Sequence, residues 1–487
     1  MRRFALFWAL ALPTAEAGQQ VERVEADSLR AFDGRARAVE RRTLVLHEAD
    51  PRGGAPVRLE VVYQRLPSRS RVAKSPIVFF MGGPGVPASL IGRIPPYWTL
   101  FDRLSDERDV ILLDQRGTGL STPSLSCPAG PPPEPGLFRS NAALREALRV
   151  TYARCLGGHS ADGAAPQLFT VEAVARDVDV IRRQLGARRV SLLGFSFGTR
   201  LALRYIQDFP ERVDQVVLQG ILGPEDGVRL PSTMDSILAR VSRAAARDST
   251  ARALVPDLSA AIGERVSALR YAPVQVTVPG AGADSVRLTI GAEGFLAIVT
   301  GRLGDPRLPA LLASLRDGDT RLLGIFAGST YRDLASGGGS LFGILMYCSA
   351  TGSEGRFRRA SLEAPGSLLG EVFDNLPTAP GFCRDVGLDP GRAEDLPAQL
   401  IPGPALLVSG SLDDRTPPAN AERARVYFAR SRTVLVENGG HELLPDERIQ
   451  ALVAGFFASG RVPAGRLTFE PPRFLTLEEA LLPPRRR

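Results

Sequence analysis

Three short runs of apolar residues in this chain each lead directly into a glycine-rich turn. Short, continuous apolar strands that end at glycine are typical of a parallel sheet covered on both faces. Between the second and third runs, residues 171, 174, 178, 181 and 185 are apolar at helical spacing. This alternation predicts a doubly wound, mostly parallel α/β sheet. The three runs are 76–80 before Met81-Gly82-Gly83-Pro84-Gly85, 109–113 before Asp114-Gln115-Arg116-Gly117-Thr118-Gly119, and 190–193 before Gly194-Phe195-Ser196.

Two stretches interrupt this alternation. Residues 127–165 are rich in proline and glycine, and we expect them to form an excursion from the sheet. Residues 223–397 contain helical patterns at 234–246 and 257–269 around a hairpin-like piece, 273–278 and 285–290. This region is expected to be an inserted, mainly helical cap. The core would then comprise residues 18–222 and 398–462, with further strands at 57–63, 215–218, 405–408 and 433–436 and helices at 199–208 and 447–458. Residues 463–487 form a Pro- and Arg-rich tail that gives no functional signal.

The N-terminus has the pattern of an export signal. Arg2-Arg3 precede a short apolar stretch, Phe4 to Leu12, and Ala15-Glu16-Ala17 matches an A-x-A-like cleavage site. We therefore expect a signal peptide over residues 1–17, cleaved near Ala17, and a secreted or periplasmic protein. The alternative is a cytosolic protein with an apolar start by chance. No stretch approaches the roughly 18 apolar residues of a membrane-spanning helix, which predicts no stable insertion into a membrane.

Cysteine usage agrees with export. The four cysteines permit three pairings, and proximity favours Cys127–Cys155 and Cys348–Cys383. Each bond would close a loop of about 30 residues and contribute about 3–4 kcal/mol. A metal site is the alternative, but no C-x-x-C or Cys/His pair has the spacing of ligands, so we expect disulfides and no metal.

The formal net charge of +7 does not by itself indicate a nucleic-acid partner. Lys74 is the only lysine, and the arginines are interleaved with Asp and Glu along the chain. The arginine clusters lack the interleaved aromatic residues on which bases would stack. We therefore expect a solvated arginine-rich surface and no nucleic-acid binding.

The pentapeptide Gly194-Phe195-Ser196-Phe197-Gly198 carries the chemistry. It follows a predicted buried strand and precedes a predicted helix, which is the placement of a nucleophile elbow in an α/β hydrolase. The flanking glycines are needed because the serine of such a turn has a strained backbone. We therefore predict that Ser196 is a catalytic nucleophile, the alternative being a structural Gly-Ser turn.

A serine nucleophile requires a base, and the chain has three histidines. His47 lies in an edge-like segment ahead of the sheet, and His159 is placed in a Gly-rich loop of the excursion. His441 follows the strand at 433–436 through Asn438-Gly439-Gly440, at the strand end where active sites of open α/β sheets collect. We predict His441 as the base, against the alternative of a surface loop histidine.

The acid of the triad is expected in the loop after the strand at 405–408. That loop contains Asp413 and Asp414, and the order Ser196, Asp413, His441 is the chain order of α/β hydrolases. Asp413 is preferred and Asp414 is held in reserve, with the other carboxylate solvated or capping a turn.

An oxyanion formed at Ser196 would need two backbone N–H donors. We assign them to Phe197, directly after the nucleophile, and to Gly83, because glycine lets the backbone approach the substrate closely. The alternative for the Gly83 segment is an ordinary Gly-Pro turn.

Taken in order, these motifs resemble the prolyl aminopeptidase and tripeptidyl aminopeptidase family of α/β-hydrolase serine peptidases. The resemblance covers about residues 57–230 and 400–445, and the excursion holding Cys127 and Cys155 is most similar to the secreted tripeptidyl aminopeptidase branch. Two departures, Met81 where the family often has histidine and Phe197 where the prolyl branch often has tryptophan, argue against strict proline specificity. The motifs are Gly82-Gly83-Pro84-Gly85, 114–121, 194–199, 410–413 and Thr416-Pro417.

The resemblance implies an exported serine aminopeptidase that acts through an acyl-enzyme on peptides with a free N-terminus and needs no cofactor. Because such exopeptidases hold the substrate amine with acidic groups, Glu225 and Asp226 are candidates, the alternative being solvated loop charges. Two other functions remain open: an extracytoplasmic esterase with the same triad, and a non-catalytic binding protein on this fold.

Overall fold

The computed structural model describes residues 21–72, 74–161, 165–279, 285–336, 340–372, 379–391, 401–461 and 466–482. The expected signal peptide, residues 1–17, lies outside these ranges, as does the glycine-containing joint 280–282 of the cap hairpin. Within the described ranges, no helix combines the length and apolar character needed to cross a membrane.

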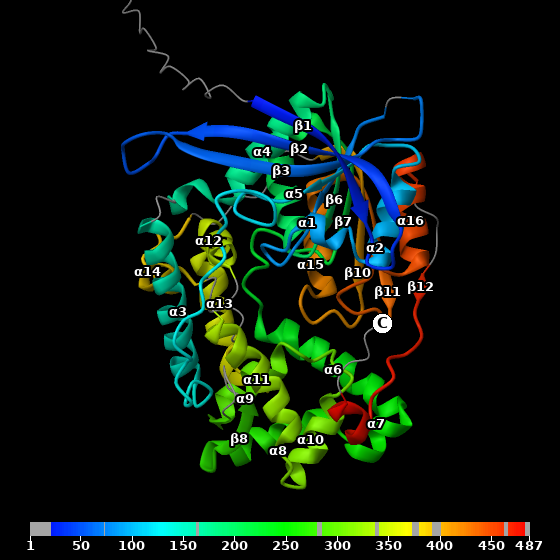
Figure 1. Ribbon diagram of the computed structural model, residues 1–487. Coiled ribbons are helices and arrows are strands. Elements are labelled where there is room, and N and C mark those ends of the chain that lie inside the picture. Colours follow the sequence, from blue (N-terminus) through cyan, green and yellow to red (C-terminus); the bar gives the residue numbers. More distant parts are fainter. Residues whose placement is uncertain are drawn as a thin grey trace, which may run out of the picture.

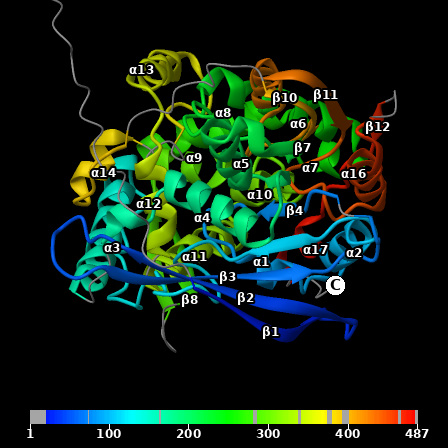
Figure 2. The same cartoon turned by 90° about the horizontal axis from the view of Figure 1, so that it is seen from above.

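A ten-stranded sheet forms the upper body of the molecule (Figure 1). Its strand order is β1-β2-β3-β5-β4-β6-β7-β10-β11-β12. All neighbours from β5 to β12 are parallel, whereas β1, β2, β3 and β5 pair antiparallel. The long strands β1 to β3 lie along one side of the molecule (Figure 2). The predicted mostly parallel α/β sheet is thereby confirmed. The strands are β1 (Val21–Arg30), β2 (Ala36–Glu48), β3 (Val57–Leu66), β4 (Ile77–Phe80), β5 (Val110–Leu113), β6 (Val190–Phe195), β7 (Val213–Gln219), β10 (Ile401–Gly410), β11 (Phe428–Glu437) and β12 (Leu467–Thr468).

Both faces of the sheet are covered by helices, as its continuous apolar strands require. Successive side chains of a strand point to opposite faces, so Phe79 packs with one hydrophobic cluster and Phe80 with the other. The first cluster includes residues of α1 (Ala88–Ile91), α2 (Pro95–Leu104) and α16 (Glu447–Ser459). The second includes residues of α4 (Val171–Gln184), α5 (Phe197–Asp208) and α15 (Pro418–Ala424).

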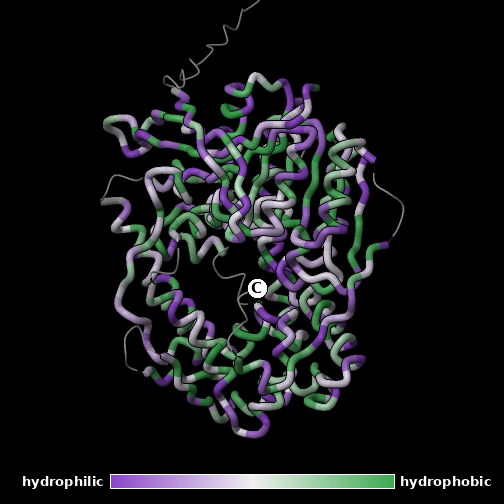
Figure 3. Tube along the Cα trace, turned by 45° about the vertical axis from the view of Figure 1, so that its right-hand side comes forward, coloured by the Kyte–Doolittle hydropathy of each residue, from purple (hydrophilic) through white to green (hydrophobic). Residues whose placement is uncertain are grey.

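The chain between β7 and β10 builds a cap below the sheet (Figure 1). The cap has a hydrophobic cluster of its own, which includes Ile237, Val241, Leu311 and Phe326. Hydrophilic and hydrophobic residues alternate along its helices (Figure 3), as expected where one face of each helix is buried. Its elements are α6 (Pro231–Arg247), α7 (Ser249–Leu254), α8 (Leu258–Tyr271), β8 (Val274–Pro279), β9 (Ser285–Ile290), α9 (Ala292–Thr300), α10 (Leu308–Arg316), α11 (Arg321–Ala335), α12 (Leu341–Ser349), α13 (Glu354–Glu363) and α14 (Pro380–Asp385).

The excursion at 127–165 differs from its expectation, because most of it is one long helix, α3 (Asn141–Ala161). Leu144 packs in the cap cluster and Leu156 in a sheet cluster, so this helix joins the two bodies. The two glycines at 157 and 158 favour a loop, yet they lie in the last helical turns. His159 is consequently on a helix rather than in a loop.

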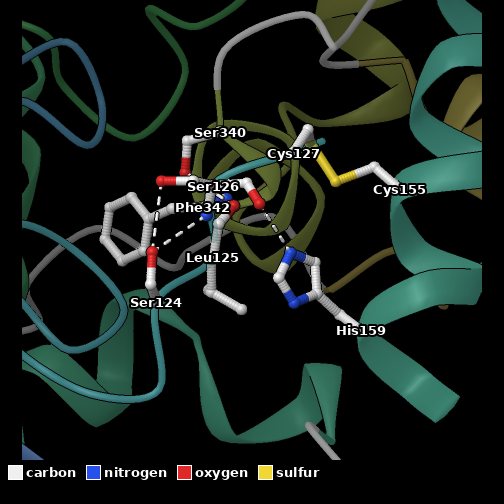
Figure 4. The surroundings of a disulfide bond; sticks show 8 residues. All are labelled: Ser124, Leu125, Ser126, Cys127, Cys155, His159, Ser340 and Phe342. Carbon is white, nitrogen blue, oxygen red and sulfur yellow. Dashed lines mark hydrogen bonds between the residues drawn. A yellow bond between two sulfur atoms is a disulfide. The ribbon is translucent and has the colours of Figure 1, made fainter. Parts of the chain in front are cut away.

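Each of the two disulfides lies within one region, the first in the excursion and the second in the cap. The structure bonds Cys127 to Cys155 and Cys348 to Cys383. Figure 4 shows the first bond beside the segment that starts α12. There the Leu341 N–H donates to the carbonyl of Leu125 at 2.9 Å. This hydrogen bond, rather than the disulfide, joins the segment before Cys127 to the first residue of the cap helix α12.

The described part of the tail connects the sheet to the cap. Strand β12 pairs with β11, and the chain then continues to the short helix α17 (Leu477–Leu481). Phe474 and Ala480 are buried in the cap cluster, and the Leu475 N–H donates to the carbonyl of Pro306 at 3.0 Å. The sequence pattern of the tail indicated none of this.

Candidate active site

Ser196 occupies the sharp turn between β6 and α5. Its φ of 54° and ψ of −127° are an unusual conformation for a residue with a side chain. A β-carbon at Gly194 would lie 2.9 Å from Thr199 Cα, and one at Gly198 would lie 2.0 Å from the carbonyl oxygen of Phe80. The two glycines of the pentapeptide are therefore required by close backbone approach, as the sequence pattern indicated.

His441 reaches Ser196 from the loop after β11. That loop begins with Asn438 at a φ of 60°, a left-handed conformation that asparagine tolerates. The His441 Nε2 atom lies 3.0 Å from Ser196 Oγ. The imidazole packs on the Phe195 ring with 5.1 Å between centroids, and 18% of the side chain is exposed. The other two histidines lie elsewhere, His47 in β2 and His159 in α3.

Asp413, rather than Asp414, faces the imidazole. Both oxygens of the fully buried Asp413 carboxylate lie 3.0 Å from His441 Nδ1. They also accept the N–H groups of Arg415 and Thr416, at 2.9 and 2.8 Å, and the Thr416 hydroxyl at 2.7 Å. These donors fix the orientation of the carboxylate toward the imidazole.

Asp414 points to the cap. Its carboxylate accepts the N–H of Gly304 at 3.0 Å, and burial raises the pKa of Asp414 above its usual range. The Asp414 carboxylate is therefore neither solvated nor a cap of its own turn, which are the two roles expected for the aspartate that does not face the imidazole. It is a contact between the loop after β10 and the cap.

The glycine-rich turn after β4 lies directly against the nucleophile. A β-carbon at Gly82 would lie 2.7 Å from Ser196 Cβ and 2.9 Å from the backbone nitrogen of Phe197. Gly83 follows at a φ of 116°, which favours glycine. The turn thus brings the Gly82-Gly83 backbone beside the Phe197 amide, and the assignment of oxyanion donors to Phe197 and Gly83 stays a prediction.

Residues 114–121 explain how that turn is held, a role that the sequence pattern did not reveal. The Asp114 carboxylate accepts the Ser89 N–H at 2.9 Å and the Ser89 hydroxyl at 2.6 Å. The Gln115 side chain donates to the carbonyl of Met81 at 3.0 Å. Arg116 is buried in an ion pair with Asp177. The motif therefore braces the residues on both sides of Gly82 and Gly83.

Glu225 and Asp226 are engaged by the protein itself. Asp226 is buried and accepts Arg423 Nη2 at 2.6 Å and the Gly223 N–H at 3.0 Å. Glu225 accepts the Ser353 hydroxyl at 2.9 Å. Asp226 is therefore paired with Arg423 within the protein, and the assignment of Glu225 and Asp226 to a substrate amine stays a prediction. The alternative of a solvated loop charge does not fit Asp226, which is buried in an ion pair.

The serine hydroxyl contacts one nitrogen of the imidazole, and the other nitrogen faces a buried carboxylate. This arrangement can activate a serine for nucleophilic attack. Among the residues that the structure describes, no group of three His, Cys, Asp or Glu side chains could hold a metal ion.

Comparison with known proteins gives two matches to family models. Residues 75–261 match the alpha/beta hydrolase fold, and residues 379–468 match a TAP-like protein. The first match spans β4 to α8 and includes Ser196, and the second includes Asp413 and His441.

Individual relatives are matched over part of their length. Serine protease Hip1 of Mycobacterium tuberculosis is 29% identical over 156 residues, which cover 30% of this chain and 29% of Hip1. A tripeptidyl aminopeptidase of Streptomyces coelicolor is 28% identical over 173 residues, which cover 34% of this chain and 31% of that enzyme. Among solved structures, an esterase from Exiguobacterium antarcticum covers 89% of this chain and 100% of its own, with 16% identity and a TM-score of 0.35.

Proposed function

This chain is an α/β hydrolase related to the tripeptidyl and prolyl aminopeptidases, and on that premise we propose that it is an exported serine aminopeptidase. It would release N-terminal residues or short peptides through an acyl-enzyme intermediate. The observation that carries the proposal is the continuous set of contacts from Ser196 Oγ through His441 to Asp413, each 3.0 Å long. Export is supported by the N-terminal sequence pattern and by the two disulfides.

In the first half of the reaction, Ser196 Oγ attacks the scissile carbonyl carbon and its proton passes to His441 Nε2. Asp413 stabilises the resulting imidazolium through Nδ1. The negative charge on the substrate oxygen is held by the backbone N–H groups of Phe197 and Gly83. Collapse of this intermediate breaks the C–N bond, and His441 returns the proton to the departing amine.

In the second half, water attacks the acyl-enzyme with His441 again acting as base. The carbonyl carbon gains the hydroxyl group of the water, and the proton taken by His441 returns to Ser196 Oγ as the ester bond breaks. The enzyme is regenerated, and the acyl fragment leaves as a carboxylic acid. No step requires a group from outside the chain except substrate and water.

The position of helix α12 in the cap favours the proposal of a substrate that is short or enters by its end. Helix α12 of the cap packs directly on the oxyanion side: the Tyr347 ring meets Phe197 edge-on at 5.4 Å between centroids. A β-carbon at Gly85 would lie 3.1 Å from the Phe342 ring of the same helix. These contacts place α12 beside the two turns that carry the proposed oxyanion donors, and a cap helix at this position supports a substrate that enters the site by its end.

The test compares anilide substrates with free and with acetylated N-termini, at one to three residues in length. We expect turnover of the free-amine substrates and at least a tenfold loss of kcat/KM on acetylation. Equal turnover of both anilide forms would overturn the exopeptidase proposal. Hydrolysis of simple aryl esters without turnover of either anilide would favour the esterase alternative.

Labelling by a fluorophosphonate tests the nucleophile separately. The wild-type protein is expected to label and Ser196→Ala to remain unlabelled. Ser409→Ala is the matched control, since Ser409 is buried and its hydroxyl has no hydrogen-bond partner among the described residues. Labelling that persists in Ser196→Ala would refute the assignment of the nucleophile.

A further inference from the structure

Gln219, the last residue of β7, contacts both the turn that carries Ser196 and the loop that carries His441. We infer that Gln219 is a positioning residue that sets the distance between nucleophile and base. This inference rests on the proposed function, because it assigns a role within the same serine-dependent reaction. Gln219 is 0% exposed, so solvent does not compete for its hydrogen bonds.

The backbone of Gln219 holds the nucleophile. Strand β7 lies between β6, which ends at the Ser196 turn, and β10, which leads to Asp413. Gln219 pairs with Phe195 on one side and Val408 on the other. Its carbonyl accepts the N–H of Ser196 at 3.0 Å. One residue in the centre of the sheet thus fixes the backbone of the strained turn.

The side chain of Gln219 holds the base. Its Nε2 donates to the carbonyl of His441 at 2.8 Å, and its Oε1 accepts the N–H of Leu443 at 3.4 Å. Both atoms of one rigid amide are therefore bonded to the backbone of the histidine loop. Replacing this buried amide by an apolar group would leave the His441 carbonyl and the Leu443 N–H without these hydrogen bonds.

The other contacts of His441 involve its ring rather than the backbone of its loop. Asp413 and Thr416 both approach Nδ1 from the loop after β10, and so they orient the ring without reaching the backbone of its own loop. Gly220 lets the ring come close to β7, since a β-carbon there would lie 3.2 Å from His441 Cε1. Of these residues, Gln219 alone joins the Ser196 turn to the His441 backbone.

The experiment uses the full chain with Gln219→Met and the matched control Gln450→Met. Methionine keeps the length of glutamine but cannot replace its amide hydrogen bonds. Gln450 is also buried, and its Nε2 donates to the carbonyls of Pro96 and Leu444, at 2.8 and 3.1 Å. It therefore anchors the same loop beyond Leu443, but these bonds reach neither His441 nor the Ser196 turn, so the control separates general support of the loop from positioning of the base. Fluorophosphonate labelling rates, kcat, KM and thermal midpoints are measured for both variants.

We expect Gln219→Met to lower the labelling rate and kcat about 100-fold, with KM changed less than threefold, because a misplacement of about 1 Å costs this much. Gln450→Met should lower the thermal midpoint by a similar amount and keep kcat within threefold of wild type. Equal kcat in the two variants would overturn the inference. A wild-type protein that fails to label overturns the proposed function instead, and the inference falls with it.

Gln219→Glu provides a second readout should the methionine variant fail to fold. A protonated carboxyl can still donate to the His441 carbonyl, whereas a carboxylate cannot, and burial shifts this ionisation toward neutral pH. The rate of Gln219→Glu relative to wild type should therefore fall as pH rises. A ratio that is constant with pH in the folded variant contradicts the positioning role.

Discussion

The catalytic edge of the sheet and the cap are held together by different kinds of contact. Ser196, Asp413 and His441 each follow a strand end, after β6, β10 and β11, and most of their hydrogen-bond partners lie on the same or a neighbouring strand end. The cap is held by contacts between distant segments, such as the Cys348–Cys383 bond and the tail on α10. We therefore expect changes at the sheet edge to reduce rate, and changes in the cap to reduce stability first.

Asp413→Asn gives the largest effect and tests the sheet edge. We expect kcat to fall about 10⁴-fold, because an amide cannot stabilise the imidazolium and favours the wrong tautomer. Asp414→Asn is the control one residue away, and kcat should stay within threefold because Asp414 faces Gly304. Steady-state kinetics of both variants decide this. A comparable loss in Asp414→Asn would mean that the two carboxylates share the role.

Gly82→Ala tests the turn after β4. The added methyl would meet Ser196 Cβ and the Phe197 amide below 3.0 Å, so the turn must move away from the nucleophile. We expect kcat to fall about 10²–10³-fold, the cost of losing an oxyanion donor. Gly440→Ala is the control in the facing loop, where a β-carbon meets nothing within 4 Å. Wild-type kcat in Gly82→Ala would show that this turn does not contribute to the oxyanion site.

The sequence predicted the sheet edge well because its signals are local. Continuous apolar runs ending at glycine located β4, β5 and β6, and the order of Ser196, Asp413 and His441 followed from which strands they succeed. The choice between Asp413 and Asp414 stayed open, since both lie in one loop and the partner of Asp414 is 110 residues away. The fold and the family resemblance are confirmed, whereas the catalytic roles remain predictions.

The cap and the excursion were less predictable, because the contacts that shape them join residues far apart in the sequence. Asp226 pairs with Arg423, 197 residues away, and nothing near Asp226 in the sequence indicates that partner. Helix α3 was not predicted within the excursion, because the proline-rich residues before it and Gly157-Gly158 near its end dominated the pattern. Its helical conformation is supported by packing on both the sheet and the cap, which is tertiary information.

Removing the Cys348–Cys383 bond tests the cap side of the comparison. The double variant Cys348→Ser with Cys383→Ser should lower the free energy of unfolding by about 3–4 kcal/mol, for a loop of about 35 residues. We expect kcat of the folded protein to fall less than tenfold, because no residue of the triad contacts this bond. Denaturant unfolding and kinetics at low temperature measure the two quantities. A loss of kcat as large as that of Asp413→Asn would erase the distinction between the regions.

Asp226→Asn gives the smallest effect and separates a structural carboxylate from an amine-binding one. Loss of the buried charge leaves Arg423 with a weaker partner and should cost about 1–3 kcal/mol of unfolding free energy. KM for a free-amine anilide should change less than twofold. A tenfold rise in KM with unchanged stability would instead restore Asp226 as an amine ligand.

The path of the tail has a consequence for recombining this protein with its relatives. Because β12 extends the sheet while Phe474 and Ala480 fill the cap cluster, the cap is not one continuous block of sequence. Leu137, Phe138 and Leu144, ahead of the nucleophile, belong to the same cluster. A chimera that exchanges only residues 231–385 would pack foreign side chains against native ones in two places, at residues 137–144 and at residues 474–480. Cross-over points for grafting a new specificity therefore have to be chosen in three separate stretches of the gene.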